Sequence, residues 1–295
     1  MKKILKSILD FLVFSNIFMA LCAVAQGLVT FHLINSKPSF AVLAILFAAT
    51  LGVYNFSIII PKPAFPQKSK HYRIRWFFAR YNLMAAITII SFLVLVPLFF
   101  YVSFESKALL IIMTFLSLGY SIPLFKIGNR KFGLRHVPGL KPLMITLVWT
   151  LSCVLLPILE VNDLHLAKIS LADTTILVAK RFFFIGALTI PFDIRDLYDD
   201  KQTNLRTIPV AWGEKNAYLF CQVLLAAYVV LLFLFRNQGF STDFWALTAT
   251  VLLTGWLIFK AKWEKNEYYY FVAMDGILVL QYVALLTFTF VASHI

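Results

Sequence analysis

Long runs of apolar residues constrain the fold of this chain more than any other feature of its sequence. A helix needs about 20 mostly apolar residues to cross a membrane. Nine segments of the 295-residue chain meet that requirement, at residues 11–34, 39–60, 82–101, 107–125, 142–161, 172–192, 216–235, 242–260 and 268–292. The chain is 61% hydrophobic, whereas soluble domains are about 45–50% apolar. The sequence therefore predicts an all-α polytopic membrane protein, in which residues 1–295 form a single integral membrane domain with nine transmembrane helices.

The amino terminus supports two interpretations. Residues 1–27 combine a basic start, an apolar run and the triplet Ala23-Val24-Ala25, a combination typical of secretory signal peptides. However, the apolar run continues past this triplet to about Ile34. We therefore favour an uncleaved first transmembrane helix over a signal peptide.

The net charge of +13 is compatible with nucleic-acid binding, but the positions of the basic residues favour another explanation. With the amino terminus placed in the cytoplasm, 21 of the 27 Lys and Arg residues fall in cytoplasmic loops and 4 fall on the other side. Cytoplasmic loops of membrane proteins carry such an excess. We therefore expect a protein of the bacterial inner membrane with a cytoplasmic amino terminus, an outer carboxyl terminus and no nucleic-acid partner.

Four aspartates stand close together after the sixth apolar run, at Asp193, Asp196, Asp199 and Asp200. If the helix continues to Asp200, then Asp193, Asp196 and Asp200 share an arc of about 60°, and Asp199 lies off that face. Carboxylates on one helix face repel each other, whereas Mg²⁺ accepts carboxylate ligands and bridges them to substrate phosphates. The spacing therefore indicates either a magnesium site or a solvated acidic loop that neutralises neighbouring basic residues.

A longer pattern around these aspartates resembles a known family motif. Asp193-Ile194-Arg195-Asp196, Asp200 and the run Arg206-Thr207-Ile208-Pro209-Val210 with Gly213 resemble the second aspartate-rich motif of the UbiA-type prenyltransferase superfamily. Tyr120-Ser121-Ile122-Pro123 is similar to the family's Y-[ST]-x-P motif at the end of the fourth helix. Nine helices, with the aspartates after the sixth, also match the family's architecture.

The resemblance implies a helical bundle around a central cavity that opens to the cytoplasm. It implies transfer of an isoprenyl chain from a polyprenyl diphosphate to an unidentified acceptor, with Mg²⁺ as cofactor. Metal and basic groups would stabilise the charge on the leaving diphosphate. The residues that it assigns to catalysis and metal binding are Asp193, Asp196 and Asp200. Arg206 is assigned to the diphosphate and Tyr120 to the substrate, and we add Lys141, which enters the fifth helix beside Tyr120, as a substrate-binding candidate.

The chain departs from the family pattern at the first aspartate-rich motif, which is expected at the end of the second helix. The sequence there runs from Asn55 to Pro63 without an acidic residue. Asn55 is in place, but Phe56, Ile59 and Pro63 stand where the family has acids. One half of the expected metal site is therefore absent.

Basic residues follow this degenerate motif. Lys68, Lys70 and Arg73 are able to hold a diphosphate by charge, and we assign them to diphosphate binding together with Asn55. The alternative is that they serve only the positive-inside topology. The missing acids also motivate a second hypothesis, a non-catalytic relative that binds an isoprenoid or lipid. A transporter is a weaker third hypothesis. Transporters often contain repeated halves, but the ends of the second and sixth helices resemble each other only loosely in sequence.

Several polar and aromatic residues inside the apolar runs remain to be placed. Lys180 and Arg181 lie in the middle of the sixth helix, where they either line the cavity or snorkel to the outer surface. Asp275 in the ninth helix is expected to pair with a Lys or Arg. The aromatic run 268–271 is interpreted as part of an interfacial belt.

Overall fold

The computed structural model describes residues 2–60, 63, 65–121, 125–127, 130–132, 139–163, 169–198, 207–237, 239–264 and 266–294. The elements of this part of the chain are α1 (Lys2–Phe14), α2 (Ile17–Leu33), α3 (Phe40–Ile59), η1 (Pro66–Lys68), α4 (Tyr72–Ala79), α5 (Tyr81–Phe100), α6 (Phe104–Ser121), β1 (Phe125–Ile127), β2 (Arg130–Phe132), α7 (Leu140–Thr150), η3 (Leu151–Leu155), α8 (Leu156–Asp163), α9 (Leu171–Arg195), α11 (Ile208–Trp212), α12 (Glu214–Leu234), η4 (Phe235–Asn237), α13 (Thr242–Lys260), η5 (Ala261–Trp263), η6 (Tyr269–Met274) and α14 (Asp275–Ala292). Apart from the short antiparallel hairpin β1–β2, these elements are helices, which confirms the all-α prediction.

The number of membrane-spanning helices is lower than the sequence predicts. Within the described residues, seven helices are long and apolar enough to cross a membrane, and the bent pair α1–α2 would make eight. The expected nine spans are therefore too many. The helix expected at 107–125 is α6, which carries the charged residues Glu105 and Lys107 near its start. The first span, expected at 11–34, is divided by the bend between α1 and α2, and α2 begins at Ile17. Several long apolar helices make the chain an integral membrane protein.

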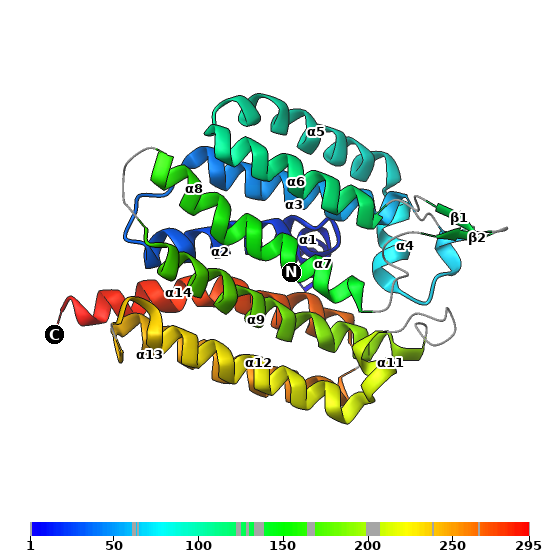
Figure 1. Cartoon of the computed structure of the whole chain (residues 1–295). Coiled ribbons are helices and arrows are strands. Elements are labelled where there is room, and N and C mark those ends of the chain that lie inside the picture. Colours follow the sequence, from blue (N-terminus) through cyan, green and yellow to red (C-terminus); the bar gives the residue numbers. More distant parts are fainter. Residues whose placement is uncertain are drawn as a thin grey trace.

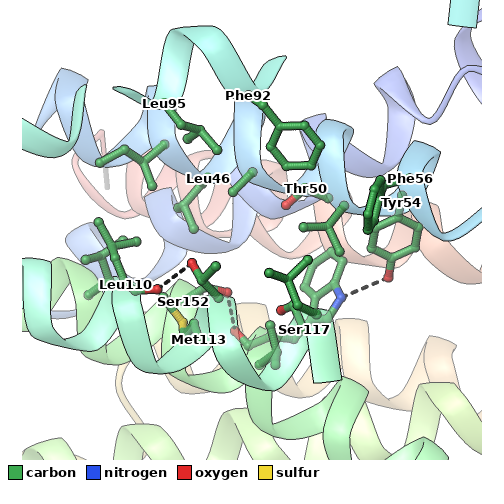
Figure 2. A pocket seen from close by; sticks show the side chains of 18 residues that line it. Leu46, Thr50, Tyr54, Phe56, Phe92, Leu95, Leu110, Met113, Ser117 and Ser152 are labelled. Carbon is green, nitrogen blue, oxygen red and sulfur yellow. Dashed lines mark hydrogen bonds between the residues drawn. The ribbon is translucent and has the colours of Figure 1, made fainter. Parts of the chain in front are cut away.

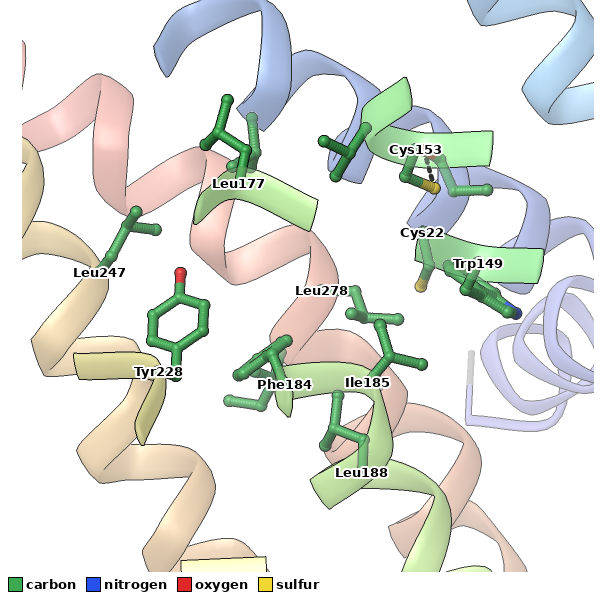
Figure 3. Close-up of a cluster of buried hydrophobic side chains, with 14 of the residues drawn as sticks. Cys22, Trp149, Cys153, Leu177, Phe184, Ile185, Leu188, Tyr228, Leu247 and Leu278 are labelled. Carbon is green, nitrogen blue, oxygen red and sulfur yellow. Dashed lines mark hydrogen bonds between the residues drawn. The ribbon is translucent and has the colours of Figure 1, made fainter. Parts of the chain in front are cut away.

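The long helices run roughly side by side, with α4 and the hairpin at one end of the bundle and the carboxyl terminus at the other (Figure 1). We call the first of these the α4 end. Helix α9 packs against α7 and α12, α2 packs against α3 and α14, and α13 lies between α12 and α14. Phe184 and Leu188 of α9 meet Tyr228 of α12 and Leu278 of α14 in the buried core (Figure 3).

Helix α5 lies on the outside of α3 and shows why the chain needs lipid around it. Ile89, Ile90 and Leu93 on this helix are exposed, although a soluble protein rarely exposes a large continuous apolar face. In a bilayer such a face contacts hydrocarbon, and the backbone polar groups are satisfied within the helix.

A hinge at Asn16 separates α1 from α2, which meet at 63°. Asn16 adopts the left-handed conformation (φ 66°, ψ 10°), which asparagine tolerates better than most residues. Its side chain is buried. Its Nδ2 donates to Asn55 Oδ1 at 2.6 Å, and its Oδ1 accepts from Arg73 Nη2 at 2.5 Å. The hinge therefore joins the amino-terminal helices to α3 and α4.

Two substitutions at the hinge separate its backbone role from its hydrogen bonds. Asn16→Gly keeps the left-handed backbone but leaves buried partners unpaired, which costs about 1–3 kcal/mol. Asn16→Ala adds a left-handed penalty of about 1–2 kcal/mol. We therefore expect thermal unfolding in detergent to rank the parent above Asn16→Gly and Asn16→Ala lowest. Equal stability of the three proteins would contradict this description of the hinge.

Candidate functional site

A cavity of about 230 Å³ at the α4 end collects charged side chains from four separate segments. The charged residues that line it are Arg73 of α4, Lys141 of α7, Asp193 and Arg195 of α9, Asp196 and Asp275. We call this cavity the charged pocket. It brings together four of the residues that the sequence assigns to the site, Arg73, Lys141, Asp193 and Asp196, and it also contains Asp275.

Asp193 is held by an ion pair with the half-buried Lys141. Gly139 has a left-handed backbone (φ 70°) that leads the chain into α7 and places Lys141 in its first turn. Lys141 Nζ lies 2.7 Å from Asp193 Oδ1. The Asp193 residue is 2% exposed, and its Oδ2 is buried without a hydrogen-bond partner among the described residues. A buried carboxylate needs such a countercharge, and the second oxygen remains available to a ligand in the pocket.

Asp196 marks the end of α9 rather than a point within it. The helix ends at Arg195, with Asp196 as its cap residue, so the prediction that the helix continues to Asp200 is wrong at this point. Leu197 and Tyr198 are helical again after the turn at Asp196, so the helix is interrupted at this aspartate. Asp199, Asp200 and Arg206 lie outside the described residues, so only the first two aspartates are placed.

Arg195 neutralises Asp196. Its Nε donates to Asp196 Oδ1 at 2.8 Å, and its Nη2 donates to Oδ2 at 3.1 Å. Burial by itself would raise the pKa of Asp196, but the hydrogen bonds and charge of Arg195 outweigh burial and lower that pKa below its ordinary value. The Asp196 carboxylate therefore stays ionised at neutral pH.

Aromatic rings surround the two arginines of the pocket. The Arg195 guanidinium lies 5.0 Å from the Tyr270 ring, 5.3 Å from Phe192 and 5.5 Å from Phe271, and that of Arg73 lies 4.7 Å from Phe271. These are cation–π distances. Burial, and then the nearby Arg195 charge, lower the pKa of Arg73 to about 10, so it remains a cation at neutral pH.

Two residues of the aromatic run 268–271, Tyr270 and Phe271, lie at or beside the charged pocket. Phe271 lines the charged pocket, and Tyr270 is buried against Arg195. Both lie in η6, a stretch of π-helix that leads into α14. Such π-helical segments often occur at functional sites, but sequence alone gives no reliable signal for them.

Asn55 and the remaining basic residues take different positions. Asn55 is fully buried and touches the pocket only indirectly, because it binds Asn16, which in turn binds Arg73. Neither Lys68 nor Lys70 is among the described residues that line the charged pocket. Lys68 instead lies over the Phe65 ring, at 5.3 Å. Tyr120 belongs to α6, and its side chain lies outside the part that the structure describes.

The positions that lack the expected acids lie on an apolar surface. Phe56 lines an apolar cavity, and its ring packs edge-on against Phe92 with 5.9 Å between the centroids. Ile59 packs against a cluster of aromatic side chains, and Pro63 is exposed. Phe56 and Ile59 therefore pack against apolar and aromatic side chains where the family pattern has metal ligands.

The apolar cavity has a volume of about 430 Å³ and lies between α3, α5, α6 and the α7–η3–α8 span. Figure 2 shows Leu46 and Thr50 of α3, Phe92 and Leu95 of α5, and Leu110 and Met113 of α6 around it.

Tyr54 and Trp149 stand between this cavity and the charged pocket. Both side chains line both cavities, and Trp149 Nε1 donates to Tyr54 Oη at 2.9 Å (Figure 2). They also line a third cavity of about 190 Å³. Neither residue was singled out in the sequence, since an isolated Tyr or Trp in an apolar run is indistinguishable from a core residue.

Three further polar residues are now placed. Lys180 and Arg181 are 1% and 3% exposed, so they do not snorkel to the outer surface. Lys180 lies over the rings of Tyr228 and Phe235, and Arg181 Nη2 donates to the Gln26 carbonyl at 3.4 Å. Asp275 lines the charged pocket, and its Oδ2 forms no hydrogen bond with any described residue.

The donor set of the charged pocket fits one magnesium ion but not a larger metal cluster. No group of three or more His, Cys, Asp or Glu side chains able to hold a metal occurs among the described residues. Asp193 and Asp196 do line the same pocket, and Mg²⁺ is commonly bound through one or two carboxylates together with substrate phosphates. The arrangement with two opposed aspartate motifs is not present, because Phe56 and Ile59 replace its acids.

Searches by sequence find no match, since no protein-family model and no curated protein matches the chain. Solved structures do match. A UbiA homologue from Archaeoglobus fulgidus bound to GPP and Mg²⁺ has a TM-score of 0.64 and 14% sequence identity, and the match covers 95% of this chain and 99% of that one. The apo structure of a UbiA homologue from Aeropyrum pernix K1 has a TM-score of 0.58 and 16% identity, covering 94% and 98%. A digeranylgeranylglyceryl phosphate synthase has a TM-score of 0.52 and 15% identity, covering 96% and 97%.

These matches cover nearly the whole length of this chain and of each matched chain, although the sequence identity is 16% or less. They confirm the fold that the resemblance implies: the chain has the helical-bundle fold of the UbiA homologues.

Proposed function

We propose that this chain is an intramembrane prenyltransferase that transfers an isoprenyl group from a polyprenyl diphosphate to an acceptor, with Mg²⁺ as cofactor. The observation that carries the proposal is the junction of two unlike cavities at Tyr54 and Trp149. The charged pocket suits a diphosphate and the apolar cavity suits an isoprenoid chain, so one amphipathic ligand would occupy both. The UbiA homologues bound to GPP and to DMAPP with Mg²⁺ support the same ligand class.

The charged pocket supplies donors for the diphosphate. Arg73, Lys141 and Arg195 place three cationic groups around it, and Arg and Lys are the usual phosphate-binding side chains. Arg73 Nε is buried without a hydrogen-bond partner within the described residues. An unpaired buried donor is costly, and a diphosphate oxygen would satisfy it.

The proposed reaction breaks the bond between the allylic carbon and the diphosphate oxygen, so the diphosphate takes the electron pair. The three cations of the pocket would stabilise its charge, and Mg²⁺, held by Asp193 and Asp196 when bound, would add to that neutralisation. Positive charge that develops on the allylic carbon would lie beside the Tyr54 and Trp149 rings, which favour a cation. A nucleophilic atom of the acceptor then forms the new bond and releases a proton.

The orientation of the protein follows from the same proposal. The α4 end carries most of the basic loop residues, and such loops face the cytoplasm. We therefore place the charged pocket on the cytoplasmic side of a bacterial inner membrane. Soluble prenyl diphosphates would reach it from there, and the isoprenoid would extend toward the middle of the bilayer.

One observation favours a second function, a non-catalytic protein that binds isoprenoid or lipid. Asp193 and Asp196 are already paired with Lys141 and Arg195, and residues 55–63, which would carry the first motif, contain no acid. A site whose carboxylates are neutralised by the protein has less need of a metal. This alternative predicts binding of prenyl diphosphates without turnover and without dependence on Mg²⁺.

The direct test is turnover by the purified protein. With Mg²⁺, labelled prenyl diphosphates of several chain lengths and a membrane extract as acceptor pool, we expect release of diphosphate and a labelled product. Asp196→Asn should reduce the rate by about 100-fold or more, because it removes a carboxylate that would hold the Mg²⁺ ion, and with it part of the stabilisation of the leaving diphosphate. Asp173→Asn, at the opposite end of the same helix, should leave the rate unchanged. Binding without turnover would favour the non-catalytic protein, and the absence of both would exclude both functions.

The role of Lys141 is tested by a neutral substitution that keeps a hydrogen-bond donor for Asp193. Lys141→Gln should weaken the binding of a prenyl diphosphate by about 10-fold or more, since a hydrogen bond from a charged group contributes about 1.5–3 kcal/mol. Isothermal titration with geranyl diphosphate measures this change. Lys37→Gln, on the loop between α2 and α3, is the matched control. Parent-like affinity in Lys141→Gln would remove Lys141 from the site.

Filling the apolar cavity should change the preferred chain length. Ala49 lines this cavity, and Ala49→Phe would occupy part of its volume of about 430 Å³. We expect the affinity for a C20 diphosphate to fall by about 10-fold, a typical cost of overpacking, while that for a C5 diphosphate stays the same. Leu93→Phe, on the exposed face of α5, is the control. A uniform loss for all chain lengths would contradict the assignment.

A further inference from the structure

A second charged cavity lies between α1 and α4, apart from the charged pocket. It has a volume of about 440 Å³ and shares no lining residue with the charged pocket. The charged residues around it are Lys3, Lys6 and Asp10 of α1 with Arg75 and Arg80 of α4. We call it the α1–α4 cavity. Neither the fold comparison nor the proposed reaction gives it a role.

The α1–α4 cavity has an excess of positive charge. Its one acidic lining residue, Asp10, accepts hydrogen bonds from Tyr72 Oη at 3.1 Å and from Tyr268 Oη. In the described part of the chain, none of the four cations forms an ion pair with a carboxylate. Arg80 lies 4.3 Å from the Trp76 ring, and Arg75 Nη1 donates to the Ser69 carbonyl at 2.5 Å. The aromatic ring and carbonyl orient the two arginines without neutralising them.

Helix α1 has the form of a helix that lies in a membrane surface. Ile4, Leu5 and Ile8 are 67%, 69% and 53% exposed. At about 100° per residue, they lie on the face opposite Lys3, Lys6 and Asp10, which line the cavity. The bend of 63° at Asn16 turns α1 away from the direction of α2. A helix with an exposed apolar face and a basic polar face is typical of the bilayer interface.

From this arrangement we propose that the α1–α4 cavity binds the phosphate group of an anionic phospholipid. The apolar face of α1 would rest among the acyl chains, and that depth brings the cavity to the level of the headgroups. Lys3, Lys6 and Arg80 then offer charge to the lipid phosphate, while Tyr72 and Trp76 provide the amphipathic aromatic surface that is frequent at membrane interfaces. A free phosphate would satisfy the cations but would leave the exposed apolar face of α1 unexplained, so the lipid is the preferred occupant.

The test is titration of short-chain phosphatidylglycerol into the purified protein in a neutral detergent, with phosphatidylcholine as the zwitterionic comparison. Each basic residue near an anionic lipid contributes a factor of about five to affinity. The double variant Lys6→Gln/Arg80→Gln should therefore bind phosphatidylglycerol about 25-fold more weakly, with thermal unfolding in detergent unchanged. Lys262→Gln, an exposed lysine at the same end of the bundle, should bind as the parent does.

Three results would overturn the proposal. They are equal affinity for the two lipids, parent-like binding by the double variant, and displacement of the lipid by inorganic phosphate at an equal concentration. The last result would indicate a site for free phosphate. The proposal is independent of the prenyltransferase function, because prenyl diphosphate binding in the charged pocket is measured separately and should not change in the double variant.

Discussion

The ion pair between the half-buried Lys141 and the buried Asp193 is the interaction on which the candidate site depends. It joins the first turn of α7 to the last turn of α9 at 2.7 Å, and both helices wall the charged pocket. Removing Lys141 would leave the buried Asp193 carboxylate without its countercharge, which is costly. The pair therefore links α7 to α9. It also keeps a lysine and a carboxylate inside an apolar bundle, where a charged ligand can contact them.

The charged groups around this site differ from those that two aspartate-rich motifs would supply. Phe56 faces the apolar cavity, and Arg73 occupies the pocket near the chain segment that would carry the first motif. Through Asn16, the same arginine is connected to Asn55, the residue of the first motif that is retained. The result is a pocket with as many cations as carboxylates among its described lining residues.

Sequence reasoning identified some parts of this site because their signals are local. Apolar runs predict spanning helices by length alone, and aspartates at helical spacing next to Arg195 predict a charged surface where α9 ends. Other parts depend on contacts between distant segments. Tyr54 and Trp149 meet across two helices, and Phe271 reaches the pocket from a π-helical turn. The count of nine spans was wrong because a fixed hydropathy window cannot recognise the hinge at Asn16 or the charged start of α6.

The central claim is that one ligand occupies both cavities, with its diphosphate beside Lys141 and its isoprenoid chain beyond Tyr54 and Trp149. The most direct measurement is an experimental structure with a non-hydrolysable prenyl thiodiphosphate and Mg²⁺. The claim predicts diphosphate density within hydrogen-bond distance of Arg73 and Lys141, and continuous density for the chain between α3 and α6. Density for the analogue on the lipid-facing surface of α5, or a diphosphate bound away from the charged pocket, would contradict it.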